Sequence, residues 1–382
     1  MTGDATIFTH PAGALEGAAA DALAARTLQI DLDTRRAVRA EAAPDLDDEG
    51  SREGALARAE RAFARHSPHA APLPRAAPDE ETAGDSADAL ASRALPSLAK
   101  CPACAAARVR AVVARAPGPL VYGCCEACGH GVCLRGGAAP GQAEARYADP
   151  TYYERRDARG VGYDDYGAEE TYRLAKGTRL VAALIRRAEG GGRALRSLLE
   201  VGSGFGFTRE AARRAGLVTG GVDLNEAACA QAARRFGLTT FVGDLAAALA
   251  AGPGSGVAPG AWDAVLYQFV LEHVASVDGE LASARRALAP GGWLAVLVPS
   301  MEAAERAVFG ASYRSLRADH LHLFSRASLR AFLERAGFEI VRLESGCNLH
   351  LLRPFLSAAA LERLYAEGLG PDLWCIARRC SE

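Results

Sequence analysis

The sequence predicts an α/β protein whose main domain is a doubly wound parallel sheet of seven strands. Two observations predict this fold: the order of the segments in the second half of the chain, and the size of the chain with its hydrophobic content. From residue 197 onward, short apolar segments alternate with segments of helical periodicity. Strands that are apolar throughout and separated by helices form a parallel sheet that is covered on both faces. The length of 382 residues and the hydrophobic content of 49% also support a sizeable core.

Composition divides the chain into four expected regions. Residues 1–98 are rich in Ala, Pro and acidic side chains, and such a composition buries too little apolar area to offset chain entropy, so we expect mostly disorder. Within them, residues 51–66 have helical apolar spacing, which also allows a helix that docks on a partner. A cysteine-rich module at 99–140 and a tyrosine-rich cap with a helix at 141–196 precede the main domain at 197–382.

Charge and hydropathy disfavour two classes of protein: nucleic-acid-binding proteins and membrane proteins. The net charge is −2, of which residues 1–100 carry −6, so the remainder carries about +4. Neither part is basic enough for bulk nucleic-acid binding. No apolar stretch reaches the ~18 residues that span a bilayer, and no basic start precedes an apolar segment. We therefore expect a cytoplasmic protein without a membrane anchor, in which cysteines stay reduced or bind metal.

Two C-x-x-C motifs separated by twenty residues favour a zinc ribbon, because each can present two thiolates to one tetrahedral ion. The expected ligands are Cys101, Cys104, Cys125 and Cys128. Three more residues are close enough in sequence to replace one of them: Cys124, His130 and Cys133. Four thiolates leave no open coordination position, so the Zn²⁺ is expected to be structural. A disulfide framework and a thioredoxin-like redox pair are the less favoured alternatives.

Six of the ten tyrosines fall in the cap, where most are expected to pack and one or two to face a ligand. They are Tyr147, Tyr152, Tyr153, Tyr163, Tyr166 and Tyr172. A helix is expected over 169–188, ending at three consecutive glycines.

The strands of the main domain are short apolar segments. We expect them at 197–201, 219–224, 239–243, 262–267, 292–298, 338–344 and 372–377. Asn225 is expected to cap a helix that closes at Gly237, and Ser325 to start another that ends before Gly337. In such sheets ligands bind beyond the carboxyl ends of the strands, near the point where the strand order reverses.

The segment LLEVGSGFGF at 198–207 reads as a buried strand that breaks into a glycine turn and opens a helix. Gly202, Gly204 and Gly206 would let backbone N–H groups approach a ligand. Asp223, twenty-one residues after Gly202, is placed to accept both hydroxyls of a ribose. Because no lysine accompanies the turn and the spacing is G-x-G-x-G, a ligand with adenosine and an amino-acid tail fits better than a dinucleotide.

Five ordered motifs and one later segment carry a family resemblance over roughly residues 100–382. They read LEVGSGFG, GVDLNE, VGD, WDAVLYQFVLEHV, LAPGGWLAVLVPS and DHLHLFSRASLRAFLERAGFEIV. The chain resembles class I S-adenosylmethionine (SAM)-dependent methyltransferases, near the ubiquinone-biosynthesis O-methyltransferases and the small-molecule methyltransferases that carry an N-terminal zinc-binding module. This resemblance implies a Rossmann-like sheet and SAM as the methyl donor.

The resemblance also implies roles for individual residues. The glycines would line the methionine moiety, Glu200 would support the loop or the ammonium, Asp223 would hold the ribose, and Asp244 would take the adenine amino group. The implied cofactor-binding set is Glu200, Gly202, Gly204, Gly206, Asp223, Asp244 and Gln268.

A base near the acceptor is useful but not obligatory, because methyl transfer depends mainly on positioning. The candidates are His320, His322 and His273. Asp319 could orient His320, which favours that residue, whereas a histidine such as His273 beside apolar residues is more often a packing residue. His322 is expected to share a strand face with His320, and Glu272 to be an acid at a helix start.

These features predict methyl transfer from SAM to an O or C atom of a small metabolite. The Asn-Pro-Pro-Tyr motif that the family uses for exocyclic amines is absent, and the corresponding segment reads Tyr-Gln-Phe-Val. One alternative is a methyltransferase of ribosomal RNA that grips RNA through the zinc ribbon, which the near-neutral charge disfavours. The other is a non-catalytic scaffold protein with this fold.

Overall fold

The computed structural model describes residues 100–107, 109–116, 118–135, 142–155, 162–163, 165–192, 194–303, 306, 313, 315–346 and 369–380. All of these belong to one compact unit. The expected N-terminal extension at 1–98 and its helical piece at 51–66 lie outside the described residues.

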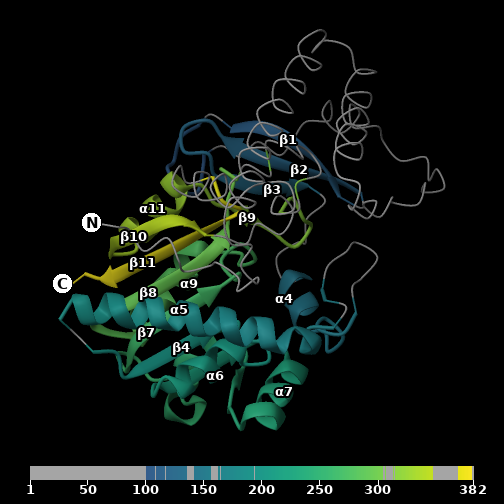
Figure 1. Ribbon diagram of the computed structural model, residues 1–382. Coiled ribbons are helices and arrows are strands. Elements are labelled where there is room, and N and C mark those ends of the chain that lie inside the picture. Colours follow the sequence, from purple (N-terminus) through teal and green to yellow (C-terminus); the bar gives the residue numbers. More distant parts are fainter. Residues whose placement is uncertain are drawn as a thin grey trace, which may run out of the picture. The chain divides into compact units, whose positions relative to one another are not determined.

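A seven-stranded sheet forms the centre of the α/β domain (Figure 1). Its strands are β4 (Ser197–Val201), β5 (Val218–Asp223), β6 (Phe241–Val242), β7 (Trp262–Gln268), β8 (Leu288–Pro299), β10 (Phe338–Gly346) and β11 (Asp372–Arg379). Their spatial order is β10-β11-β8-β7-β4-β5-β6, so the order reverses between β4 and β7. This confirms the doubly wound, Rossmann-like α/β fold.

One strand departs from the expected parallel arrangement. β11 pairs antiparallel with both β8 and β10, whereas β4, β5, β6, β7 and β8 pair in parallel. The apolar content of residues 372–377 indicates burial on both faces, but it does not specify the direction of a strand.

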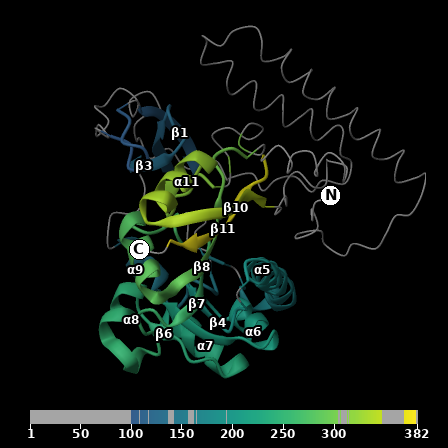
Figure 2. The same ribbon diagram turned by 90° about the vertical axis from the view of Figure 1, so that its left-hand side faces the viewer.

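Helices cover both faces of the sheet (Figure 2). They are α5 (Glu170–Gly190), α6 (Phe207–Arg214), α7 (Glu226–Phe236), α8 (Leu245–Ala251), α9 (Val277–Ala287) and α11 (Arg326–Arg335). The sheet separates two apolar cores, one on each face, and successive residues of β7 point into opposite ones. Val265 packs with α8, α9 and α11, and Ala264 packs with α5 and α6. None of the described helices is long and apolar enough to cross a membrane.

Local sequence signals set the helix ends. The Asn225 side chain accepts a hydrogen bond from Ala228 N at 2.8 Å, and α7 closes at Gly237, which is left-handed. Ser325 begins α11 with a capping box. The predictions at both helices are confirmed, whereas β6 covers only two of the five residues expected at 239–243.

The cysteine-rich module contributes three strands to a second sheet of four strands. Its order is β1 (Val109–Ala116), β2 (Gly118–Cys125), β3 (Gly131–Arg135) and β9 (His322–Leu323). β9 comes from the late part of the α/β domain and pairs antiparallel with β3. Cys101 and Cys125 share the core that contains Phe332. The module and the α/β domain are therefore joined by both backbone pairing and apolar packing.

Candidate functional site

The glycine turn lies at the carboxyl end of β4, beside the point where the strand order reverses. Gly202, Gly204 and Gly206 all have positive φ values, of 69°, 52° and 78°. A Cβ atom at Gly202 would clash with Cγ2 of Val270, which follows β7. The turn therefore requires glycine for its backbone conformation, and at Gly202 also for the approach of a neighbouring segment.

We expect Gly202→Ala to lower both stability and SAM affinity, because the new methyl group meets Val270 and the left-handed backbone disfavours a side chain. Val270→Ala in the same chain should recover part of the loss by removing the clash. Thermal melting and calorimetric titration with SAM measure the two effects. A double variant no better than Gly202→Ala would show that the clash contributes nothing.

Asp223 ends β5 and holds the glycine turn. One carboxylate oxygen accepts from Gly204 N at 2.6 Å, and the other accepts from Asn225 N at 2.8 Å. Burial raises the pKa of this carboxyl, although the two backbone donors oppose the rise. Asp223 therefore fixes the loop against β5, and it stands where a ligand held by the loop would extend.

Glu200 supplies a second buried carboxylate beneath the loop. Its Oε2 atom has no hydrogen-bond partner among the described residues, and neither has Oγ of Ser203. Burial raises the pKa of Glu200 to about 8, although the nearby Arg209 opposes the rise. Unpartnered buried oxygen atoms beneath the glycine loop fit a ligand that brings its own donors, such as an ammonium group.

Two further residues of the expected cofactor set lie at strand ends. Gln268 ends β7, and its Oε1 accepts from Thr208 Oγ1 at 3.2 Å, at the start of α6. Asp244 follows β6 as the N-cap of α8, where its side chain accepts from Ala247 N at 2.7 Å. Both therefore lie at the carboxyl-end edge of the sheet, as do Glu200 and Asp223.

Tyrosines from the cap lie over the glycine turn. A Cβ atom at Gly204 would lie 3.3 Å from the hydroxyl oxygens of both Tyr153 and Tyr166. The two rings contact each other and Phe205, with centroid distances of 4.8 to 5.2 Å. The cap thus presents two phenol hydroxyls to the middle of the turn.

A buried lysine lies against the segment whose next residue, Val270, contacts the glycine turn. Lys176 of α5 is buried, and its Nζ lies 4.5 Å from the ring centroid of Phe269, which follows β7. The next residue, Gly177, packs so closely on α6 that a Cβ atom there would lie 2.8 Å from Thr208 Cα. The sequence signal was available, since Lys176 is one of only two lysines in the chain, but packing of α5 on α6 was needed to place it.

Glu272, His273 and His320 come together beyond the end of β7. One ligand-type atom from each residue lies within 4.8 Å of those of the other two. Glu272 and His320 are buried, while 14% of the His273 side chain remains exposed. Burial lowers the pKa of both histidines, to about 3 for His320, so their imidazoles are neutral at neutral pH. We refer to these three residues as the histidine cluster.

Asp319 orients His273, not His320 as expected. The Asp319 carbonyl oxygen lies 2.7 Å from Nδ1 of His273, and its carboxylate pairs with Arg317 at 2.9 Å. Burial opposes ionisation, but His320, His273 and Arg317 hold the pKa of Asp319 well below its usual range. Tyr147, from α4 (Gln142–Tyr147), adds a hydroxyl 2.5 Å from the same Nδ1 atom. The sequence placed Tyr147 among the cap tyrosines without assigning it this contact.

His322 lies apart from the histidine cluster. Its Nδ1 is 3.2 Å from Nε2 of His130, in the core between β3 and α11. The expectation that it shares a strand face with His320 is wrong, because β9 begins at His322 and His320 precedes it outside any strand. Glu272 also differs from its prediction, since it lies in a turn and not at a helix start.

Four of the module's cysteines converge. The Sγ atoms of Cys101 and Cys128 lie 3.6 Å apart, as do those of Cys104 and Cys125, and all four lie within 4.8 Å of one another. Sulfur atoms bound ~2.3 Å from one tetrahedral zinc ion lie about 3.8 Å apart, so this set fits Zn²⁺. The three spare candidates do not join the group: Cys124, His130 and Cys133.

Hydrogen bonds connect the cysteine module to the histidine cluster. The Tyr122 hydroxyl of β2 donates to the carbonyl oxygens of Arg317 and His320, at 2.6 and 2.9 Å. Leu321 N and His322 N both donate to the carbonyl oxygen of Glu272, at 2.7 and 3.0 Å. The module therefore helps to fix the backbone on which His320 and Glu272 stand.

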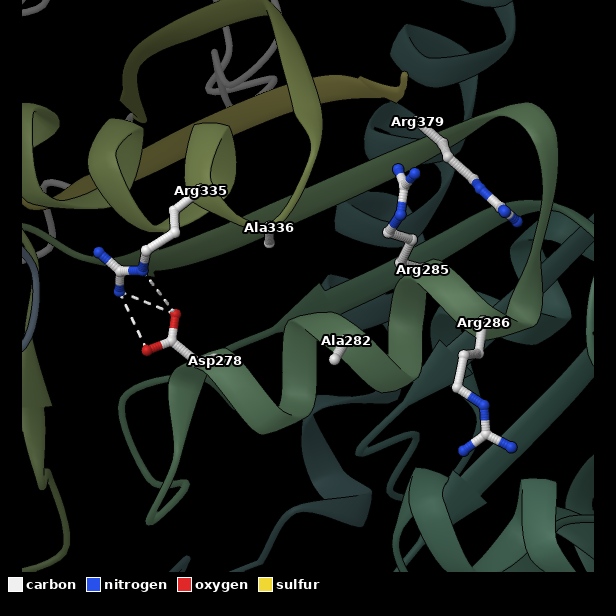
Figure 3. A pocket seen from close by; sticks show the side chains of 7 residues that line it. All are labelled: Asp278, Ala282, Arg285, Arg286, Arg335, Ala336 and Arg379. Carbon is white, nitrogen blue, oxygen red and sulfur yellow. Dashed lines mark hydrogen bonds and ion pairs between the residues drawn. The ribbon is translucent and has the colours of Figure 1, made fainter. Parts of the chain in front are cut away.

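An arginine-lined hollow lies elsewhere on the domain (Figure 3). Arg285 donates to the carbonyl oxygen of Gly337, Arg379 donates to that of Leu288, and Arg335 pairs with Asp278 at 2.8 Å. Leu288 begins β8, so this region is at the amino-end edge of the parallel strands, opposite the glycine turn. Because protein groups already engage these arginines, the hollow is not the centre of the chemistry.

Residues 171–343 match the family model of a methyltransferase domain. With the fold and the strand-end carboxylates, this match decides the identity of the domain. The protein carries a SAM-dependent methyltransferase domain. Glu200 beneath the glycine turn has an unpartnered oxygen that could accept from an ammonium group such as that of SAM.

Several solved structures resemble the chain. A complex of the Haloferax volcanii Trm112 methyltransferase activator with a methyltransferase matches at 17% identity and a TM-score of 0.43, over 63% of this chain and 98% of the other. A SAM-dependent methyltransferase from Archaeoglobus fulgidus matches at 20% identity and 0.40, over 55% and 97%. The 1,6-didemethyltoxoflavin-N1-methyltransferase of Burkholderia thailandensis matches at 18% identity and 0.41, over 69% and 96%. No curated protein sequence matches the chain.

Proposed function

We propose that this methyltransferase transfers the methyl group of SAM to an oxygen or carbon atom of a small metabolite. The observation that carries the proposal is the position of the histidine cluster. His273 N donates to the carbonyl oxygen of Val270 at 2.9 Å, and Val270 is the residue that contacts Gly202. The histidine cluster, which is the proposed acceptor side, therefore lies a few residues from Val270, which contacts the glycine turn of the proposed donor side.

The donor side is proposed to consist of the strand-end residues. Glu200 and the three glycines would hold the amino-acid end of SAM, Asp223 the ribose and Asp244 the adenine amino group, while Gln268 would contact the cofactor from the end of β7. SAM supplies a methyl group on a sulfonium, which is an excellent leaving group. The surrounding carboxylates stabilise a cationic ligand.

Lys176 is proposed to bind the carboxylate of the amino-acid end. Its charge lies against the segment that contacts the glycine turn, and burial strengthens a charge interaction. We expect Lys176→Met to weaken SAM binding about tenfold, which corresponds to ~1.4 kcal/mol. Lys100→Met is the matched control, because Lys100 is exposed and is the other lysine of the chain. Equal affinities of the two variants in calorimetric titration would contradict this role.

His273 is proposed to receive the acceptor's proton. The Asp319 carbonyl oxygen can only accept a hydrogen bond, so Nδ1 of His273 carries the proton and Nε2 carries the lone pair. An acceptor hydroxyl would pass its proton to Nε2 while its oxygen attacks the methyl carbon and the carbon–sulfur bond breaks. His320, which is more deeply buried, would support this site, while the imidazole of His322 faces His130 instead.

A screen with SAM labelled in its methyl group tests the function. Labelled product is expected from hydroxylated or enolisable small molecules, with the label on oxygen or carbon. His273→Ala should lower kcat much more than SAM affinity, because the residue lies on the acceptor side. If SAM binds but label passes only to RNA, the methyltransferase of ribosomal RNA becomes the better assignment. If SAM does not bind the folded protein, the scaffold reading becomes the better one.

A further inference from the structure

The histidine cluster has the composition of a divalent-cation site. It offers two imidazoles and one carboxylate from two separate segments, the turn after β7 and the turn before β9. The rings of His273 and His320 meet edge to face, with centroids 4.8 Å apart. Two histidines and a carboxylate are a ligand set that borderline first-row divalent metals use in proteins.

The contacts of each imidazole leave a lone pair for an ion. Nδ1 of His273 lies 2.7 Å from the carbonyl oxygen of Asp319, and Nδ1 of His320 lies 2.8 Å from that of Ser315. Because a carbonyl oxygen can only accept, both Nδ1 atoms carry protons and both Nε2 atoms carry lone pairs. Metal-binding histidines are commonly fixed by this kind of bond to a backbone carbonyl.

Glu272 lacks the partner that a buried carboxylate needs. Its side chain is 1% exposed, and neither carboxylate oxygen has a hydrogen-bond partner among the described residues. Burying an unpaired carboxylate costs several kcal/mol, so the group must either take up a proton or face a cation.

The separations suit one ion. Oε1 of Glu272 and Nε2 of His273 lie 3.9 Å apart. Two ligand atoms that are each ~2.1 Å from a metal ion lie at most ~4.2 Å apart, so this pair can share an ion as it stands. A ring nitrogen of His320 lies within 4.8 Å of ligand atoms of the other two residues.

We propose that Glu272, His273 and His320 bind a first-row divalent cation such as Mn²⁺, Co²⁺ or Zn²⁺ on the proposed acceptor side of the site. Three protein ligands leave positions open for oxygen atoms of the acceptor. With the cation bound, Nε2 of His273 is a ligand and the cation takes over from it as the group that promotes deprotonation: it lowers the pKa of the bound hydroxyl, whose proton leaves to solvent. This assigns the acceptor as a hydroxyl with a neighbouring oxygen that can chelate the ion, and this part rests on the proposed O-methyl transfer.

The test is a calorimetric titration of the full chain with MnCl₂, after the cysteine module has been loaded with one equivalent of Zn²⁺. We expect one Mn²⁺ per chain. Glu272→Gln and His320→Ala should each weaken this binding at least tenfold. Glu280→Gln should leave it unchanged, because that carboxylate already accepts from the Tyr267 hydroxyl at 3.0 Å. The same series with Co²⁺ should give a spectrum without the intense sulfur-to-cobalt band of a thiolate site.

Two further measurements separate the possible outcomes. Bound zinc and melting temperature show whether a variant is folded, and SAM affinity shows whether the donor side is intact. Absence of Mn²⁺, Co²⁺ and Zn²⁺ binding beyond the cysteine module, with SAM still bound, overturns the cation site and leaves the proposed function standing. Binding of Mn²⁺ that is equal in wild type, Glu272→Gln and His320→Ala also overturns it. A cation bound with no SAM affinity overturns the proposed function alone.

Discussion

Asp223→Ala is expected to reduce the affinity for SAM at least ~100-fold. The change removes the acceptor of two backbone N–H groups, at Gly204 and Asn225, and the proposed partner of the ribose hydroxyls. Hydrogen bonds to a charged group contribute ~1.5–3 kcal/mol each, so loss of the two proposed bonds to the ribose hydroxyls accounts for ~2.7 kcal/mol or more, which is a hundredfold in affinity. Calorimetric titration with SAM at neutral pH measures this loss, and thermal melting should show a separate loss of stability from the two orphaned backbone donors.

The controls for Asp223 separate the loop from the ribose. Asp223→Asn keeps one carbonyl oxygen for a backbone donor and should fall between wild type and Asp223→Ala. Asp278→Ala removes an exposed carboxylate that pairs with Arg335, and it should leave SAM affinity unchanged. An Asp223→Ala variant that is folded and binds SAM as tightly as the wild type would exclude the ribose role.

The second large effect is expected on removal of the proposed zinc site. Wild-type protein should contain about one equivalent of Zn²⁺, and a Cys101→Ser/Cys104→Ser variant should contain none. Structural zinc supplies several kcal/mol to folding, so the melting temperature should fall by more than about 10 °C. Elemental analysis and thermal melting measure these two quantities. Cys124→Ser/Cys133→Ser is the matched control, because those thiols lie outside the four-cysteine group, and it should retain the metal.

Zinc removal should also affect methyl transfer more than SAM binding. The module holds the histidine cluster, the proposed acceptor side, through Tyr122, which donates to the carbonyl oxygen of His320, and through β3, which pairs with β9. The glycine turn and Asp223 are held by β4 and β5 and do not depend on these contacts. Full retention of zinc, or an unchanged melting temperature without zinc, would contradict a structural role.

Local signals in the sequence were sufficient for much of the fold. The apolar segments that alternate with helices predicted the seven strands, because burial on both faces leaves little room for polar residues. Asn225, Gly237 and Ser325 marked helix ends through bonds that need only neighbouring residues. The methyltransferase assignment followed from the same local order of motifs at strand ends, because parallel strands carry their functional residues at one edge.

The antiparallel direction of β11 and the placement of β9 in the other sheet did not follow from the sequence. Direction and partner depend on which strand edge is free once the rest has folded, and a two-residue strand has too short a pattern to indicate either.

The proposed donor side and acceptor side differ in how far the sequence determined them. The glycine turn and Asp223 lie next to apolar strands whose ends they mark, so their place at the carboxyl-end edge of the sheet could be predicted. Lys176, Tyr147 and the three members of the histidine cluster take their places through packing between distant segments. Only the tertiary structure decided that Asp319 orients His273, that His320 is held by Tyr122, and that His322 faces His130 instead. The reason is physical: the direction of a side chain in a turn is set by the partners that surround it, and these come from elsewhere in the chain.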